Sequence, residues 1–284
     1  MIIAEDIDVV RNHIKSWKAD GEKIGFVPTM GNLHKGHISL ISSLKQAGAT
    51  KIIASIFVNP TQFSIGEDYT EYPRTFDSDQ KKLRKHSIDL LFSPSTEVMY
   101  PKNILSELTI KYPEYNNILC GEHRPSHFSG VLCVVNKLFN IINPDIAVFG
   151  QKDYQQFILI KGMVRDLCMP IEMFCAPIVR ESDGLALSSR NQYLSKQERL
   201  IAPKLYESLK EAKISIDNKL KIVDIENNAI DFLSKNNFLV DYFSVRRSKD
   251  LKKVDSNQSF NKSIIILTAV KIGRTRLIDN ILIS

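Results

Sequence analysis

Short apolar segments alternate with amphipathic segments over the first 178 residues of the chain. The apolar segments are rich in Ile, Val and Phe, which favours strands, whereas the segments between them repeat apolar residues at helical spacing. Strands are predicted at 23–29, 51–58, 88–93, 145–150 and 171–176, and helices at 36–47, 77–86, 127–142 and 155–167. This alternation predicts an α/β domain in which a parallel sheet has helices on both faces.

The order of segments changes after residue 178. Two charged amphipathic segments at 195–216 and 223–236 are predicted to be helices, and three apolar segments at 239–245, 264–270 and 276–283 to be strands. Helices followed by strands predict a smaller C-terminal α+β domain. We therefore expect two domains, residues 1–178 and 179–284.

The composition is that of an ordinary globular protein, with 43% hydrophobic and 25% charged residues. The first residues lack the basic and apolar regions of a secretory signal, and the purest apolar run, 264–270, is too short to span a bilayer. We expect a cytoplasmic protein without a membrane partner. The four cysteines form no metal-binding or redox motif, so we expect unpaired and mostly buried thiols.

The net charge of +6 comes entirely from residues 179–284, because Lys and Arg balance Asp and Glu in the first 178 residues. A basic domain suits an anionic ligand or a nucleic acid, although a merely solvated basic surface explains the charge equally well. The basic residues form no recognisable platform studded with aromatic residues, as a nucleic-acid-binding surface would have. We therefore expect no nucleic-acid partner.

The segment 28–37, Pro-Thr-Met-Gly-Asn-Leu-His-Lys-Gly-His, is predicted to run from a buried strand through a tight turn into a helix. Backbone N–H groups and the dipole at a helix start favour an anion. His34 and His37 are three residues apart, so both rings can face the same side of the helix. The pattern indicates a polyphosphate site, although two structural histidines would produce it as well.

Two further segments carry groups suited to phosphate. Lys152 follows a predicted strand and offers a compact positive charge, while Asp153 offers a carboxylate for a phosphate-bound Mg²⁺. The sequence Leu187-Ser188-Ser189-Arg190 places hydroxyls beside a guanidinium. The alternatives are an ordinary strand-to-helix loop and a polar hinge with a helix cap. The P-loop, dinucleotide-binding and Gly-x-Ser-x-Gly motifs are absent from the sequence.

These segments belong to a set of short motifs that runs along nearly the whole chain. The set comprises residues 28–37, 57–63, 72–75, 124–128, 150–156, 187–191 and 273–280. In this order the motifs resemble the pantothenate synthetase (pantoate–β-alanine ligase) family, within the Rossmann-like nucleotidyl-transferring enzymes that carry an HxGH motif. The resemblance implies a Rossmann-like catalytic domain followed by a C-terminal lid domain, and a homodimer.

The resemblance implies a two-step ligation. ATP and (R)-pantoate would give pantoyl adenylate and diphosphate, and the amine of β-alanine would then displace AMP to give pantothenate. His34 and His37 would lie at the phosphates, with His37 as the proton donor, and Lys152 would stabilise the α-phosphate. Mg²⁺ would accompany ATP, with Asp153 as a candidate ligand.

The resemblance also assigns the binding residues. Those for ATP are Met30, Gly31, Asn32, Leu33, His34, Lys35, Gly36, His37, Gly150, Gln151, Lys152, Asp153, Val179, Leu187, Ser188, Ser189 and Arg190. Gln62 and Gln156 would bind pantoate, with Asn59 close by. The chain departs from the family pattern at Gln151, where Glu is usual, and at Ser126, where Gly is usual and would allow a positive φ.

Other functions fit parts of the pattern. A nucleotidylyltransferase could use the same histidines but would leave AMP on its product. A nucleic-acid-binding protein would use the basic second domain and show strongly salt-dependent RNA binding. A non-catalytic relative is disfavoured because both histidines and Lys152 are present.

Overall fold

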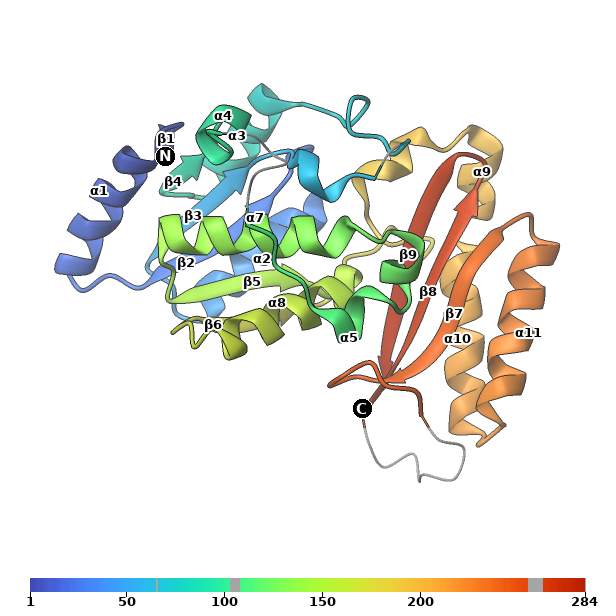
Figure 1. Cartoon of the computed structure of the whole chain (residues 1–284). Helices are drawn as coiled ribbons and strands as arrows, with labels where there is room; N and C mark the ends of the chain where they lie inside the picture. The colour runs from blue at the N-terminus through green and yellow to red at the C-terminus, as the bar shows by residue number, and fades with distance from the viewer. Residues whose placement is uncertain (65, 103–107, 255–262, 284) are drawn as a thin grey trace. The chain divides into compact units, whose positions relative to one another are not determined.

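The computed structural model describes residues 1–64, 66–102, 108–254 and 263–283. These residues form two compact units (Figure 1). The first unit consists of residues 1–150 and 159–177, and the second of residues 151–158 and 178–284. Residues 151–158 thus belong to the second unit although they precede residue 178.

The first unit is built on a six-stranded parallel sheet with the strand order β1-β4-β3-β2-β5-β6. Its strands are β1 (Ile2–Ala4), β2 (Ile24–Thr29), β3 (Lys51–Ile56), β4 (Leu90–Phe92), β5 (Ile146–Gly150) and β6 (Glu172–Ala176). The order reverses between β2 and β5, and ligands of open parallel sheets bind beyond the carboxyl ends of strands at such a reversal. The turn after β2 therefore lies at this edge.

Helices cover both faces of this sheet, as predicted. Residues that alternate along β2 point to opposite faces. Val27 belongs to the core that Leu40 and Leu44 of α2 (Lys35–Gln46) complete. Phe26 instead contacts Phe139 of α7 (His127–Ile142), with ring centroids 6.3 Å apart. The fold class expected for this part of the chain is confirmed.

The remaining elements of the first unit are short or peripheral. They are α1 (Ile7–Ala19), the 3-10 helix η1 (Pro60–Gln62), α3 (Phe76–Lys85), α4 (Thr96–Met99), α5 (Pro113–Asn116), α6 (Cys120–His123) and the second part of α8 (Tyr154–Asp166). Strand β1 and helix α1 were not predicted. The Asp6 side chain caps α1 by accepting hydrogen bonds from the N–H groups of Asp8 and Val9.

The second unit is a three-stranded antiparallel sheet with two long helices packed against it. Its strands are β7 (Leu239–Arg247), β8 (Ile264–Ile272) and β9 (Thr275–Ile283), in the order β7-β8-β9. Its helices are η3 (Gln151–Asp153), the start of α8, η4 (Ser189–Tyr193), α9 (Lys196–Ile201), α10 (Lys204–Asp217) and α11 (Ile222–Lys235). Leu209 and Leu233 are fully buried in its core. The predicted α+β class is confirmed.

Two expectations need correction. The helix predicted at 195–216 is two helices, because Pro203, the N-cap of the second, has no N–H group with which to continue the first. The cysteines are all unpaired, but only Cys120 is buried, and Cys168 is exposed. Within the described residues, no helix has the length and apolar character needed to cross a membrane.

Candidate active site

A buried carboxylate fixes the backbone conformation of the turn after β2. Gly31 and Asn32 have left-handed backbone conformations, with φ of 85° and 51°. Asp79 of α3 accepts hydrogen bonds from the N–H groups of Asn32 and Leu33, both at 2.8 Å. A Cβ atom at Gly31 would lie 3.3 Å from the Asp79 carboxylate, so the turn and the carboxylate fit closely.

Asp79 was not among the site residues expected from sequence. Its side chain is completely buried. It also accepts a hydrogen bond from the Thr75 hydroxyl at 3.0 Å, and the Lys82 ammonium lies 3.7 Å away. Lys82 in turn donates to the Leu33 carbonyl at 2.7 Å. These two side chains of α3 therefore fix the shape of the turn that precedes the histidines.

His34 and His37 lie side by side at the start of α2, as their spacing predicts. His34 is the N-cap: its Nδ1 accepts from the Gly36 N–H at 3.1 Å, and the Nδ1 of His37 accepts from the His34 N–H at 3.3 Å. The ring centroids are 4.1 Å apart. Because each Nδ1 accepts a backbone N–H, the proton of each neutral ring lies on Nε2, which makes both Nε2 atoms donors. Exposed Lys35 is the first residue of the helix.

The structure brings Gln62, Met30 and Asn59 together in the first unit. The Gln62 amide donates to the sulfur of Met30 at 2.9 Å, and its oxygen accepts from the Asn59 amide at 3.3 Å. Asn59 is also bound by the Tyr100 hydroxyl at 2.7 Å and donates to the Gly130 carbonyl at 3.2 Å. The Asn59 side chain therefore orients Gln62.

An ion pair holds the backbone of the same loop. Arg124 donates to both carboxylate oxygens of Glu67, each at 2.6 Å, and to the Gln62 carbonyl at 3.4 Å. Partial burial raises the pKa of Glu67, but the hydrogen bonds and charge of Arg124 outweigh this effect and hold the pKa below its ordinary value of 4.5. Ser126 has φ of −93°, so the loop does not need a glycine there.

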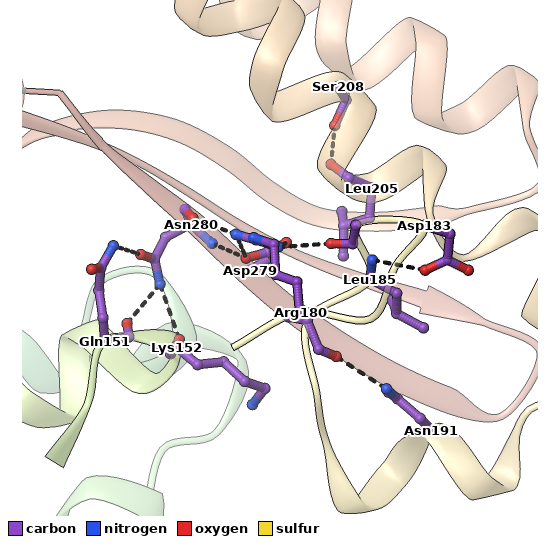
Figure 2. Close-up of polar contacts among 12 residues, drawn as sticks. Gln151, Lys152, Arg180, Asp183, Leu185, Asn191, Leu205, Ser208, Asp279 and Asn280 are labelled. Atoms are coloured by element: carbon purple, nitrogen blue, oxygen red, sulfur yellow. Dashed lines mark hydrogen bonds and ion pairs between the residues drawn. The ribbon is translucent and has the colours of Figure 1, made fainter. Parts of the chain in front are cut away.

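In the second unit, the turn that carries Lys152 is bound to β9 (Figure 2). The Asn280 amide donates to the carbonyls of Gln151 at 2.8 Å and Lys152 at 3.0 Å. The Gln151 amide donates back to the Asn280 side-chain oxygen at 3.1 Å. The Lys152 ammonium lies 3.5 Å from the Asp153 carboxylate.

The residues between Val179 and Arg190 that are expected to bind ATP belong to the second unit. The Leu187 N–H donates to the Val179 carbonyl at 3.0 Å. Ser188 caps η4, since its hydroxyl accepts from the Arg190 N–H at 3.3 Å. Ser189 and Arg190 are partly exposed at the start of η4, and Gln156 is partly exposed in the first turn of α8.

Asp153 is the one expected metal ligand. No cluster of three or more His, Cys, Asp or Glu side chains occurs in the parts of the chain that the structure describes. Mg²⁺ commonly binds nucleotides through one or two carboxylates together with the phosphates and water. A single, half-exposed carboxylate beside a lysine fits that mode, in which the nucleotide supplies other ligands.

The parallel sheet, with a helix that starts at two histidines after β2, defines a Rossmann-like α/β protein. The family model described as pantoate-beta-alanine ligase matches residues 2–282. The chain belongs to this family.

The chain is also similar to known proteins and solved structures over nearly its full length. A pantothenate synthetase from Hydrogenovibrio crunogenus is 43% identical, with all of both chains covered, and one from Shewanella oneidensis is 42% identical, with 99% of each covered. The crystal structure of pantothenate synthetase from Thermus thermophilus has a TM-score of 0.90 at 36% identity, with 99% of each chain covered. That of pantoate-beta-alanine ligase from Francisella tularensis, complexed with beta-gamma ATP and beta-alanine, has a TM-score of 0.82 at 38% identity and covers 99% of this chain and 97% of its own.

Proposed function

We propose that the protein condenses (R)-pantoate with β-alanine to (R)-pantothenate, with ATP as the energy source, through a pantoyl-adenylate intermediate. In the first step the pantoate carboxylate attacks the α-phosphorus of ATP and diphosphate leaves. In the second step the β-alanine amine attacks the acyl carbon and AMP leaves. The family membership and the full-length relatives support this reaction.

The first step needs positive charge and N–H donors more than it needs a base. Pantoate is already ionised at neutral pH, and two negatively charged reactants must meet while charge builds on diphosphate. At the start of α2, His34 and His37 present Nε2 donors beside the helix dipole, and we assign them to the phosphates, with His37 as the proton donor. Lys152 is assigned to the α-phosphate, where its ammonium stabilises the transition state.

Gln62 and Gln156 are proposed to bind pantoate. The amide oxygen of Gln62 is fixed by Asn59, and its amide nitrogen lies at the Met30 sulfur, a weak acceptor that a substrate oxygen can replace. The Asn59 side chain also forms hydrogen bonds with the Tyr100 hydroxyl and the Gly130 carbonyl. We therefore propose that Asn59 orients Gln62 and does not itself bind pantoate.

The remaining ATP contacts are assigned by segment. In the first unit, Met30–His37 supply the turn and helix start. Gly150, the last residue of β5 in the first unit, leads into the Gln151–Asp153 segment. In the second unit, Val179 and Leu187 border adenine, and Ser188, Ser189 and Arg190 hold the distal phosphates. When bound with ATP, Mg²⁺ would neutralise phosphate charge, with Asp153 as its protein ligand.

The second step requires that water be kept from the acyl adenylate, because hydrolysis would waste ATP. The β-alanine amine must lose its proton before attack, and its pKa resembles that of other alkyl amines, so the step should accelerate as pH rises toward that value.

We further propose a cytoplasmic homodimer. The four unpaired cysteines are consistent with a reducing compartment. The dimer follows from the family resemblance, and light scattering of the purified protein would test it by giving the mass of two chains.

The observation that carries the proposed reaction is the match to the ligase family over residues 2–282, with the double-histidine turn in place at the carboxyl end of β2. Incubation with ATP, pantoate and β-alanine should yield pantothenate, AMP and diphosphate in equal amounts. Formation of ADP and phosphate, or of an adenylylated product that β-alanine leaves intact, would contradict it.

A further inference from the structure

A buried polar network in the second unit connects the Lys152 turn to the Val179–Arg190 segment (Figure 2). Its centre is the pair Asp279 and Asn280 on β9, whose exposed fractions are 3% and 1%. Neither residue belongs to the ATP or pantoate contacts assigned above. Burying a polar side chain costs free energy unless it is fully hydrogen-bonded, so each group of this network needs a partner.

The Asn280 side chain forms hydrogen bonds with the turn that carries Lys152. Its amide nitrogen donates to the backbone carbonyls of both Gln151 and Lys152, and its oxygen accepts from the Gln151 side chain. All of its side-chain hydrogen-bonding groups are therefore directed at the turn. The Lys152 carbonyl oxygen lies 3.0 Å from the Asn280 amide nitrogen. This hydrogen bond fixes the backbone of Lys152 and therefore restricts the position of its side chain.

Asp279 connects Asn280 to the second segment through Arg180. The Arg180 guanidinium donates to both Asp279 oxygens, at 2.6 and 2.9 Å, and to the Asn280 carbonyl at 3.2 Å. Asp279 also accepts from the Asn280 N–H at 2.7 Å. Arg180 packs on the ring of Tyr206, 3.7 Å from its centroid, and donates to the Gly184 carbonyl.

Arg180 lies between the residues assigned to ATP in the second segment. It follows Val179 directly and forms an antiparallel bridge with Ala186, which precedes Leu187. Asn191 donates to the Ala186 carbonyl at 3.0 Å, which ties η4 to the same bridge. Both segments are thus anchored on two consecutive residues of β9.

We propose that Asn280 is a positioning residue for the ligation, and that with Asp279 and Arg180 it fixes the Lys152 turn and the Val179–Arg190 segment in one geometry. This inference rests on the proposed role of Lys152 in the first step. Asn280 contributes no group to the reacting atoms, since its side chain is fully used by the turn. Misplacing a charge by about 1 Å can lower a rate by about 10²-fold, so loss of this anchor should reduce kcat strongly.

The test is Asn280→Asp, which keeps the size of the side chain but replaces the donating nitrogen with an oxygen that repels both carbonyls. We expect kcat for pantoate-dependent diphosphate release to fall about 10- to 100-fold, with a smaller change in the KM for ATP. Hydrogen exchange in residues 151–158 should become faster. In a Lys152→Ala background the same substitution should lower kcat by less than about 2-fold, because the group it positions is gone.

Leu233→Ala is the matched control, because it weakens the core of the same unit without touching the turn. Both proteins are assayed below their melting transitions. A loss of kcat in Leu233→Ala as large as in Asn280→Asp would overturn the positioning role, and so would additive losses in the double variant.

The exchange measurement separates this inference from the proposed function. Unchanged exchange in residues 151–158 of Asn280→Asp overturns the anchor, whatever the enzyme catalyses. Faster exchange with unchanged kcat overturns the link between the anchor and catalysis. If the wild-type protein releases no diphosphate, the proposed function fails, and the exchange result alone decides whether Asn280 holds the turn.

Discussion

Lys152 is the side chain whose removal should harm the first step most. Lys152→Ala removes the charge that is proposed to stabilise the α-phosphate and should lower the rate of pantoate-dependent diphosphate exchange by about 10² or more. Lys161→Ala, an exposed lysine farther along α8, serves as the control and should leave the rate unchanged. Near-normal exchange in the purified Lys152→Ala variant would refute the assignment.

Gln62 and Gln156 are expected to act on pantoate more than on ATP. Gln62→Ala and Gln156→Ala should each raise the KM for pantoate more than the KM for ATP, because each removes an amide that is proposed to bind pantoate. Steady-state kinetics with each substrate varied in turn measures the difference. Gln46→Ala, on the exposed face of α2, should change neither. Equal effects on both substrates would reject the assignment.

The Glu67–Arg124 pair should stabilise the protein in a pH-dependent way. The pKa of Glu67 is lowered in the folded state, so its stabilisation is complete above the ordinary value of 4.5 and is lost as pH falls through the lower folded value. Glu67→Gln should therefore cost about 1–3 kcal/mol at pH 7. The gap in melting temperature between wild type and variant should narrow as pH falls below 4.5. A gap that is constant from pH 7 to the lowest pH at which both proteins are folded would contradict this.

Among the elements, the contact between α7 and η1 positions Gln62, which is proposed to bind pantoate. A Cβ atom at Gly130 would overlap the backbone of Thr61 and Gln62, so α7 needs a glycine there for η1 to approach. Gly130→Ala should lower stability by about 1–3 kcal/mol and raise the KM for pantoate by displacing Gln62. Thermal unfolding and kinetics measure the two effects.

The control for Gly130→Ala is Asn140→Ala, on the exposed part of the same helix. It should leave the KM for pantoate unchanged. An unchanged KM in Gly130→Ala as well would show that η1 adapts without moving Gln62.

The elements that could be predicted are those with a strong local signal. Helix α7 begins and ends at the predicted residues, His127 and Ile142, because apolar residues recur on its buried face and Asn143 ends it with φ of 44°. Strand β1 has only three residues, which is too few for a period to be read. Helix α1 carried a usable signal in its Asp6 cap, and Pro203 marked the break between α9 and α10.

At the scale of the whole molecule, the two units differ in how far the sequence specifies them. The α/β and α+β classes follow from the order of strands and helices, which is a local property. The assignment of residues 151–158 to the second unit does not follow from this order. It depends on hydrogen bonds between residues far apart in the sequence: Gln151 with Asn280, 129 residues later, and the Tyr154 hydroxyl with the Ser248 carbonyl.

Contacts between residues far apart in the sequence also explain which supporting residues of the candidate site were not predicted. The histidine turn was found because its residues are adjacent and have a recognisable spacing. Asp79 supports that turn from 47 residues beyond Asn32, and nothing in the sequence around Asp79 indicates it. Asn280 was part of a recognised motif, but its role depends on partners that only the folded unit brings near. Supporting residues of a site are fixed by tertiary contacts, so their roles emerge from the structure.

The proposed function depends on activation of pantoate as an adenylate before β-alanine takes part. The most direct measurement is diphosphate release from ATP in a single turnover, with pantoate present and β-alanine absent. A burst that requires pantoate is expected, followed by release of AMP when β-alanine is added. Release without pantoate, or none until β-alanine is present, would contradict it.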